Sequence, residues 1–250
     1  MRWRTLVASP PRYGGFALVK SKKGNDADGG PMVTGVLRVP RRIVVASGKG
    51  GSGKTTTTRN LAVAAVHADL LVTTVDLDES PTLTTWWKRR PELLPAIEHM
   101  AAPIDQIDGD LRGEVEAIGD CDLLIVDTPP SLTAYPQHAR GLIRSADLVL
   151  VPCQQYDEDL DAVAAWITLA NDLGARSLIL LNRTQRRESS FEAAKRRLVK
   201  LGRLCPIDIP HFADVPKTFT RGLGVAEVRG AKGGADYEAV LDHLRSEVGF

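Results

Sequence analysis

Cysteine is scarce in this 250-residue chain, which contains three: Cys121, Cys153 and Cys205. They lie far apart and form neither a CxxC pair nor a Cys/His spacing typical of a metal site. A sparse, odd count of this kind predicts reduced thiols in a cytosolic protein. We expect them to be small buried hydrophobic side chains, with an iron–sulfur ligand role left open as the alternative.

Net charge and long apolar runs are also lacking. The net charge is +1, so any role with nucleic acid or membrane must depend on a local patch of basic residues. No apolar run reaches the roughly 20 residues that a membrane-spanning helix needs. The basic N-terminus is not followed by the apolar segment of a secretory signal. With 43% apolar and 25% charged residues, the composition predicts a soluble, intracellular globular protein.

Residues 1–40 differ from the rest of the chain. They contain Pro10-Pro11, two Gly-Gly pairs and the basic run Lys20-Ser21-Lys22-Lys23, with little apolar periodicity. We expect an irregular, basic N-terminal extension that is disordered and has no specific role. Binding of an acidic partner, or a true start at Met32, are the alternatives. The remaining residues, 41–250, are expected to form a single domain.

Short apolar runs alternate with helical patterns from Ile43 onward. This alternation predicts a parallel sheet covered on both faces, because right-handed crossovers place helices on both sides. We therefore expect a doubly wound, mostly parallel α/β fold with three layers, in which ligands bind at the carboxyl ends of the strands. The expected strands are 43–46, 70–75, 123–126, 148–151 and 177–181, and the expected helices are 54–68, about 158–173, 190–202 and 235–248.

A glycine-rich turn follows the first expected strand and fits the pattern GxxxxGK[ST] from Gly48 to Thr55. Glycines let the backbone curl so that its N–H groups point at phosphate oxygens, and the following helix presents its positive end to the same anion. Lys54 would supply a positive charge to the β- and γ-phosphates, and Thr55 a hydroxyl to Mg²⁺. The expected nucleotide-binding residues of this turn are Gly48, Lys49, Gly50, Gly51, Ser52, Gly53, Lys54, Thr55 and Thr56.

A second lysine, Lys49, lies early in the turn, where most phosphate-binding loops have none. The run Lys49–Thr56 reads KGGSGKTT and resembles the deviant loop KGGxGKTT of the ParA/MinD family of ATPases. The resemblance spans about residues 41–248 and implies a P-loop ATPase domain that binds ATP and Mg²⁺. It also implies a homodimer in the ATP state, in which Lys49 reaches the partner's nucleotide and acts with Lys54 as a catalytic cation. A solvated loop lysine is the alternative for Lys49.

Two acids follow the second expected strand, in the segment Val75-Asp76-Leu77-Asp78. This segment resembles the family's DxDPQ segment, which implies that Asp78 is catalytic and orients the attacking water. The same resemblance implies that Asp76 lies near Mg²⁺. Glu79-Ser80 stands where the family has Pro-Gln, and this departure bears on water positioning and on the hydrolysis rate. A helix N-cap is the alternative for the two acids.

Three further residues follow later strands. Asp127 ends a run of four apolar residues in the Walker B form and would hold Mg²⁺ through a water. Its continuation Thr128-Pro129-Pro130 resembles the family's DTPP segment, which senses the γ-phosphate. Asn182, after the fifth expected strand, resembles the residue with which the family hydrogen-bonds adenine, and Pro210 resembles a second adenine contact. For Asn182 and Pro210, a simple turn residue is the alternative.

Basic residues gather after the fifth expected strand, with few acids among them. On a helix, Arg196, Lys200 and Arg203 share a face, which could neutralise DNA phosphates without reading the sequence. ParA-type proteins bind DNA nonspecifically through comparable surfaces, so the resemblance favours DNA binding over a merely solvated helix face. The expected DNA-binding residues are Arg183, Arg186, Arg187, Lys195, Arg196, Arg197, Lys200 and Arg203.

Within the family, the chain resembles the short ParA type, because about 40 residues before the domain leave little room for an operator-binding motif. We expect a cytoplasmic, nucleoid-associated partition ATPase that dimerises on ATP and binds DNA. A ParB-like centromere-binding protein would stimulate its slow hydrolysis and release it, which segregates a plasmid or chromosome. The alternative is a MinD-like or ParA-like positioner of a cytoplasmic or membrane cargo. Membrane binding is not expected, because the last helix carries several acids and one arginine and should pack on the domain.

Overall fold

The structure is a computed structural model and describes residues 38–130 and 132–250. The expected basic extension lies outside the described residues, apart from residues 38–40. One sheet runs through the described part, in the order β3-β2-β4-β1-β5-β6-β7, and every neighbouring pair of strands is parallel. Its strands are β1 (Arg41–Val45), β2 (Val72–Asp76), β3 (Glu98–Ala101), β4 (Leu123–Asp127), β5 (Leu148–Cys153), β6 (Ser177–Thr184) and β7 (Ile209–Pro210).

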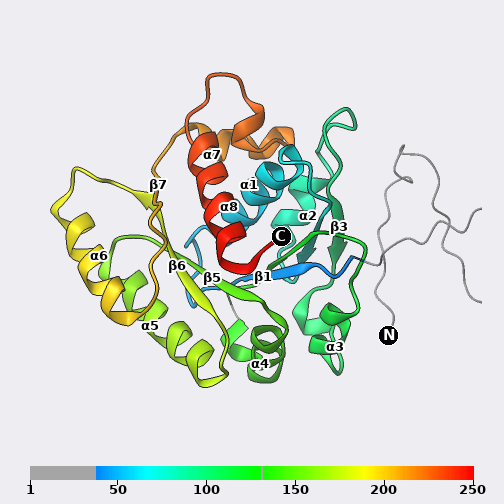
Figure 1. Cartoon of the computed structure of the whole chain (residues 1–250), viewed down its shortest axis with the longest axis horizontal. Helices are drawn as coiled ribbons and strands as arrows, with labels where there is room; N and C mark the ends of the chain where they lie inside the picture. Colours follow the sequence, from blue (N-terminus) through cyan, green and yellow to red (C-terminus); the bar gives the residue numbers. More distant parts are fainter. Residues whose placement is uncertain (1–37, 131) are drawn as a thin grey trace, which may run out of the picture.

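Helices cover both faces of this sheet (Figure 1). Side chains alternate along β1, so Ile43 and Val45 pack against one layer of helices while Val44 packs against the other. The first layer contains α1 (Lys54–His67), α2 (Thr82–Trp87), α7 (Asp214–Lys217) and α8 (Gly234–Val248). The second layer contains α3 (Leu111–Glu116), α4 (Pro136–Ser145), α5 (Asp157–Asp172) and α6 (Ser189–Leu201). The predicted doubly wound, three-layer fold is thereby confirmed.

The five strands expected from apolar runs are all present, and the structure adds β3 and β7 at the two edges of the sheet. Only His99 is buried among the four residues of β3, so this edge strand lacks the continuous apolar run of the inner strands. The strand expected at 70–75 begins instead at Val72. An edge strand has a neighbouring strand on one side only and is less buried, so it lacks the apolar run from which the inner strands are predicted.

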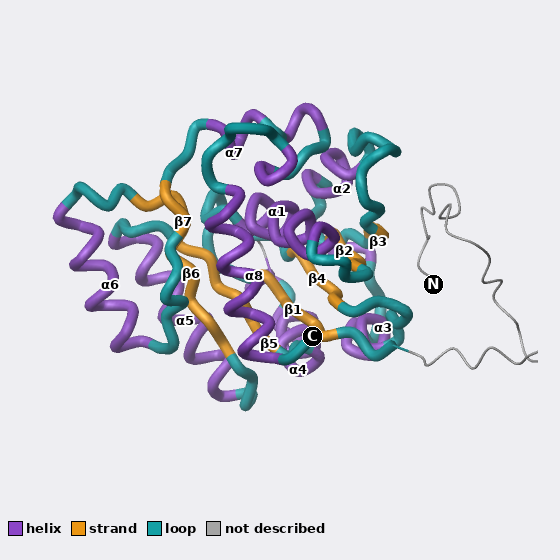
Figure 2. The backbone as a smooth tube through the Cα atoms, turned by 45° about the horizontal axis from the view of Figure 1, so that its top comes forward, coloured by secondary structure: helices purple, strands orange, loops and turns teal. Residues whose placement is uncertain are grey.

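The last helix, α8, packs on the domain as expected. Its buried side chains belong to the same apolar cluster as α1, and the two helices lie side by side in both views of the backbone (Figures 1 and 2). Burial of this apolar face leaves only the polar face of α8 toward solvent. Nowhere in residues 38–130 and 132–250 is a helix long and apolar enough to cross a membrane.

Candidate functional site

The glycine-rich turn lies between β1 and α1, at the carboxyl edge of the sheet. Gly51 and Gly53 have φ values of +80° and +97°, in the left-handed region that favours glycine. A Cβ atom on Gly53 would lie 2.3 Å from Nδ2 of Asn182, so this position has no room for a side chain. The hydroxyls of Ser47 and Ser52, which are 2.7 Å apart, close the base of the turn. The backbone therefore has the curled shape that a phosphate-binding loop needs.

Lys54, Thr55 and Asp127 form the inner part of the site. The hydroxyl of Thr55 donates to Oδ2 of Asp127 at 2.6 Å, and Nζ of Lys54 donates to the carbonyl of Lys49 at 3.3 Å. Burial raises the pKa of Asp127 to about 7, although the hydrogen bond from Thr55 acts in the opposite direction. Burial likewise lowers the pKa of Lys54. The hydroxyl of Thr55 and the buried carboxylate of Asp127 are neighbouring oxygen groups. They fit the oxygen ligand set that Mg²⁺ prefers, and a cation there would favour the ionised form of Asp127.

Asp76 and Asp78 lie side by side but make different contacts. Oδ2 of Asp76 accepts hydrogen bonds from the backbone N–H and the hydroxyl of Thr84, both at 2.8 Å. Its Oδ1 accepts from the N–H of Asp78 at 3.1 Å, and Oδ1 of Asp78 accepts from the N–H of Ser80 at 2.9 Å. Asp76 thus satisfies an amide in the first turn of α2. It is buried, whereas Asp78 is partly exposed.

Lys49 points to a different place from Lys54. Its Nζ lies 2.8 Å from Oε2 of Glu158 and 3.7 Å from Oδ2 of Asp159, both in the first turn of α5. The hydrogen bond to Glu158 raises the pKa of Lys49, which stays charged. Lys49 is partly exposed, whereas Lys54 is buried. The loop therefore carries one lysine inside and one at its rim.

Asn182, at the end of β6, lies directly beneath the loop. It is 1% exposed, and its Nδ2 lies 3.3 Å from the hydroxyl of Thr57. Its Oδ1 accepts from the backbone N–H of Arg183 at 2.9 Å. Pro210 lies on the neighbouring strand β7, where it pairs with Thr184. The two residues expected near adenine thus lie on neighbouring strands, with Asn182 against the phosphate loop, and their contact with the base remains a prediction.

The expected DNA-binding residues are not equivalent in the structure. Arg186 pairs with Asp208, Arg203 pairs with Glu247, and Arg197 pairs with both Asp157 and Asp161 of α5. Two others have partners that are not acids, since Arg183 donates to the carbonyl of Gly51 and Lys195 lies over the ring of Phe191. Of the eight expected residues, Arg187, Arg196 and Lys200 are exposed and have no ion pair with the part of the chain that the structure describes.

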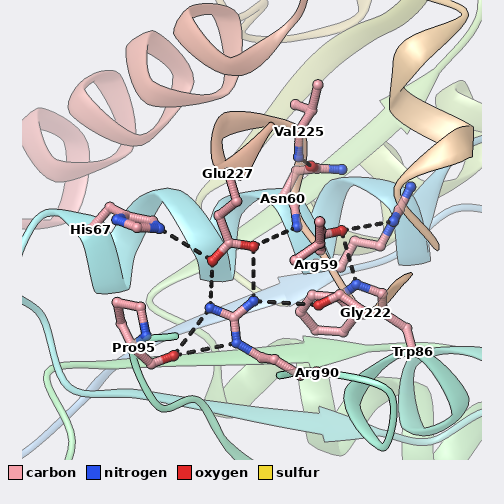
Figure 3. Close-up of polar contacts among 11 residues, drawn as sticks. Arg59, Asn60, His67, Trp86, Arg90, Pro95, Gly222, Val225 and Glu227 are labelled. Carbon is pink, nitrogen blue, oxygen red and sulfur yellow. Dashed lines mark hydrogen bonds and ion pairs between the residues drawn. The ribbon is translucent and has the colours of Figure 1, made fainter. Parts of the chain in front are cut away.

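An ion pair that the sequence did not indicate joins the chain just after α2 to the segment that follows β7 (Figure 3). The guanidinium of Arg90 forms two hydrogen bonds with the carboxylate of Glu227, at 2.6 and 3.0 Å, with side chains 6% and 2% exposed. Glu227 also accepts from the N–H of Gly224 at 2.8 Å and contacts His67 at 3.2 Å. A buried, bidentate pair of this kind ties α2 to the segment that follows β7.

Arg59 ties α1 to the same segment. Its guanidinium is buried and donates to the carbonyl of Val215 at 2.6 Å, the hydroxyl of Thr218 at 2.9 Å and the carbonyl of Leu223 at 3.3 Å. Trp86 of α2 donates to the same Leu223 carbonyl at 3.0 Å (Figure 3). Burial lowers the pKa of Arg59 to about 10, so the group remains protonated at neutral pH. The chain after Pro210 is thus fastened to α1, which follows the phosphate loop, and to α2, which follows the loop of Asp78.

Comparison with known proteins agrees with this geometry. Residues 43–225 match the family described as CobQ/CobB/MinD/ParA nucleotide binding domain. Maintenance of carboxysome distribution protein A of Gloeobacter kilaueensis is 30% identical over 218 residues, which cover 82% of this chain and 94% of that protein. The Thermus thermophilus chromosome-partitioning ATPase Soj is 30% identical over 160 residues, 54% of this chain and 63% of Soj.

Solved structures share the fold. A Borrelia burgdorferi protein described as a plasmid partition protein, bound to AMPPNP, superposes with a TM-score of 0.69 at 14% identity, covering 84% of this chain and 100% of that one. The septum site-determining protein MinD of Pyrococcus horikoshii, complexed with Mg-ADP, gives 0.68 at 19% identity and covers 84% and 98%. The family match runs from β1 past β7 and so includes the phosphate loop and all the strand ends described above. The chain therefore belongs to the ParA/MinD family of P-loop ATPases.

Proposed function

We propose that this protein is an ATP-driven switch of the ParA type, which dimerises on ATP, binds DNA nonspecifically and is released on hydrolysis. The observation that carries the proposal is that the two lysines of the phosphate loop lie in different places. Lys54 is buried inside the loop, whereas Lys49 lies at its rim, where a second subunit could be reached. A cation supplied across an interface would make the dimer depend on the nucleotide.

ATP with Mg²⁺ is the proposed ligand. The loop amides and Lys54 would bind the phosphates, while Thr55 and Asp127 would hold Mg²⁺, which neutralises charge on the β- and γ-phosphates. Asp78, partly exposed at the edge of the site, would accept the water's hydrogen bond and orient it. Asn182 and Pro210 would contact adenine. The relatives bound to AMPPNP and Mg-ADP support this assignment.

DNA is the proposed matrix for the dimer. Arg187, Arg196 and Lys200 are exposed and could contact phosphates directly, which gives affinity without sequence readout. A ParB-like protein would stimulate slow hydrolysis and so release the dimer near the nucleoid. Similarity to the partition ATPase Soj supports this proposal.

Positioning of a cytoplasmic cargo is the second candidate function. The relative in Gloeobacter kilaueensis, whose name refers to carboxysome distribution, covers more of this chain than Soj does. Such a positioner could use the same ATP-dependent dimer on DNA, so the two candidates differ in the cargo and not in the site.

The dimer is tested with Lys49→Ala. This variant should bind ATP but remain monomeric and lose most hydrolysis, as measured by light scattering with ATP or ADP and by phosphate release. Lys232→Ala, which removes an exposed lysine far along the chain, serves as the control and should behave like the wild type. ATP-dependent dimers of normal activity in Lys49→Ala would contradict the proposal.

The DNA role is tested by a salt titration of binding to unrelated duplexes, with ATP and with ADP. Arg196→Ala with Lys200→Ala should weaken binding in ATP and flatten its salt dependence. The control is Arg140→Ala with Arg144→Ala, which removes two exposed arginines from α4. If the α6 variant binds like the control, DNA is not held by this surface and the proposed role of Arg196 and Lys200 is wrong.

A further inference from the structure

A line of buried polar side chains leads from Asp76 into the protein, away from the phosphate loop. The hydroxyl of Thr84 lies 2.8 Å from Oδ2 of Asp76 and 2.9 Å from Nε2 of His99. The other ring nitrogen, Nδ1 of His99, lies 2.9 Å from the hydroxyl of Thr74. All four side chains are buried, with exposures of 1% for Asp76, 4% for Thr84, 3% for His99 and 0% for Thr74. Three strands or helices, β2, α2 and β3, thus meet in one hydrogen-bonded line.

The direction of each hydrogen bond follows from the chemistry of the groups. Burial raises the pKa of Asp76, but three hydrogen bonds from Thr84 and Asp78 favour its ionised form. An ionised carboxylate only accepts, so the Thr84 hydroxyl donates its proton to Asp76. The oxygen of Thr84 must then accept from His99, which fixes the proton of the neutral ring on Nε2. Nδ1 is left as an acceptor for the hydroxyl of Thr74. The hydroxyl of Thr74 also lies 3.2 Å from the carbonyl oxygen of Glu98, but the ring nitrogen is the nearer acceptor at 2.9 Å. With this arrangement of protons, both ring nitrogens of His99 and the Asp76 carboxylate have a hydrogen-bond partner.

His99 is held in this orientation by its surroundings. The indole of Trp87 stacks on the imidazole, with ring centroids 5.0 Å apart and an angle of 26° between planes. Nε1 of Trp87 donates to the carbonyl of Ile97 at 2.7 Å, which fixes the indole in turn. Burial, with a smaller contribution from the charge of Lys88, lowers the pKa of His99 to about 3, so the ring is neutral at physiological pH.

The loop after β2 needs such support. The family's proline, which would fix a backbone angle after Asp78, is replaced by Glu79. The loop is braced instead by hydrogen bonds, from the N–H of Asp78 to Asp76 and from the N–H of Ser80 to Asp78. The backbone of Leu77 is held by the carbonyl of Asp127 and the N–H of Ile104, and the Asp76 carboxylate adds the contact that reaches Asp78 itself.

We infer that Thr84 and His99 are positioning residues for ATP hydrolysis, which fix Asp76 and through it the loop that carries Asp78. Both side chains are buried, and their hydrogen bonds go to Asp76, to Thr74 and to each other rather than to the phosphate loop. The inference rests on the proposed function, in which Asp78 orients the attacking water. Partners in a second layer around a site commonly change activity by about 10- to 100-fold when removed.

The test uses two substitutions of one residue. Thr84→Val keeps the shape of the side chain and the backbone N–H but removes the hydroxyl, whereas Thr84→Ser keeps the hydroxyl. In Thr84→Val, kcat should fall about 10- to 100-fold while the Kd for a fluorescent ATP analogue changes little. Thr84→Ser, which keeps the hydroxyl, should have a kcat close to that of the wild type. A purely structural role would lower the melting temperature of Thr84→Val without lowering kcat per folded molecule, and that outcome would overturn the inference.

A second measurement does not involve activity. Nitrogen-15 NMR of the histidine rings should find the proton of His99 on Nε2 in the wild type, and a proton on Nδ1 would contradict the proposed line. Asp78→Ala separates this inference from the proposed function. If Asp78→Ala hydrolyses ATP normally, the proposed role of the loop is wrong, and the inference falls with it. If Asp78→Ala is inactive while Thr84→Val has the wild-type kcat, only the positioning inference is wrong.

Discussion

The ammonium group of Lys49 lies 2.8 Å from the carboxylate of Glu158, on the first turn of α5 in the same chain. Lys49 is also the lysine proposed to reach the nucleotide of a second subunit. It cannot do both at once, because its single Nζ would have to leave Glu158 to meet a phosphate. The ion pair within the chain therefore competes with the proposed contact across the dimer.

Glu158→Gln should favour the dimer. Removing the carboxylate weakens the hold on Lys49, so dimerisation should occur at a lower ATP or protein concentration. The pair is exposed and screened by solvent, so we expect a shift of only about two- to five-fold. Analytical ultracentrifugation with ATP measures it, with Glu238→Gln on α8 as the exposed control. Unchanged or weaker dimerisation in Glu158→Gln would show that the ion pair with Glu158 does not compete with the dimer contact of Lys49.

Gly53→Ala should abolish nucleotide binding. The added methyl group would lie 2.3 Å from Nδ2 of Asn182, and the backbone at φ +97° disfavours any side chain. Gly174→Ala is the matched control, because Gly174 also has a positive φ of +70° but open space around its Cβ position. The control should lose about 1–2 kcal/mol of stability and bind nucleotide normally. Nucleotide binding is measured by fluorescence titration. An equal loss of binding in both variants would show that the contact with Asn182 is not the reason for the loss.

Much of the fold and of the phosphate loop could be predicted from the sequence because their signals are local. The inner strands are continuous apolar runs, and Gly53, Lys54 and Thr55 lie within one turn whose chemistry requires them. The packing of the C-terminal helix on the domain could be predicted as well, because the helix carries several acids and one arginine.

The partners of charged residues could not be predicted, because they are distant in sequence. Nothing near Arg197 indicates that Asp157 and Asp161 lie on the adjoining helix, or that Arg59 would be buried on α1. The line from Asp76 to His99 depends on β3, an edge strand without an apolar pattern. These features follow from tertiary packing, and a single sequence carries no signal for them.

The buried pair of Arg90 and Glu227 predicts a response to acid. Burial alone would raise the pKa of Glu227, but the hydrogen bonds and charge of Arg90, aided by the N–H of Gly224, hold it below the ordinary 4.5. With a lower pKa in the folded state, the unfolded chain binds the proton more readily. The stabilisation is therefore present above about pH 4.5 and is lost as pH falls through the folded-state pKa.

Glu227→Gln should show a smaller loss of stability between pH 5 and pH 3 than the wild type, measured from urea midpoints. At pH 7 it should be less stable by about 3–5 kcal/mol, because Arg90 keeps a buried charge without its partner. The double substitution Arg90→Met with Glu227→Leu removes both charges and should cost less than the single one. If the double variant is the less stable of the two, the charge of Arg90 is not the reason for the loss.

Arg196 and Arg197 should contribute unequally to DNA binding, although they are neighbours on α6. Arg196 is exposed, and the described residues offer it no ion pair, whereas Nη1 of Arg197 lies 3.1 Å from Oδ1 of Asp157 and its Nη2 contacts Asp161. Arg196→Ala should lower the slope of log K against log salt by about 0.9, the value for one phosphate contact on duplex DNA. Arg197→Ala should change the slope less, because its charge is already balanced.

Neutralising the acids provides the converse experiment. Asp157→Asn with Asp161→Asn frees Arg197, so DNA affinity in the ATP state should rise and the salt slope should steepen. Asp172→Asn, at the opposite end of α5, removes an acid without releasing Arg197 and serves as the control. An Arg197→Ala slope equal to that of Arg196→Ala, together with no gain on neutralising the two acids, would mean that the ion pairs of α5 do not restrain the basic face of α6.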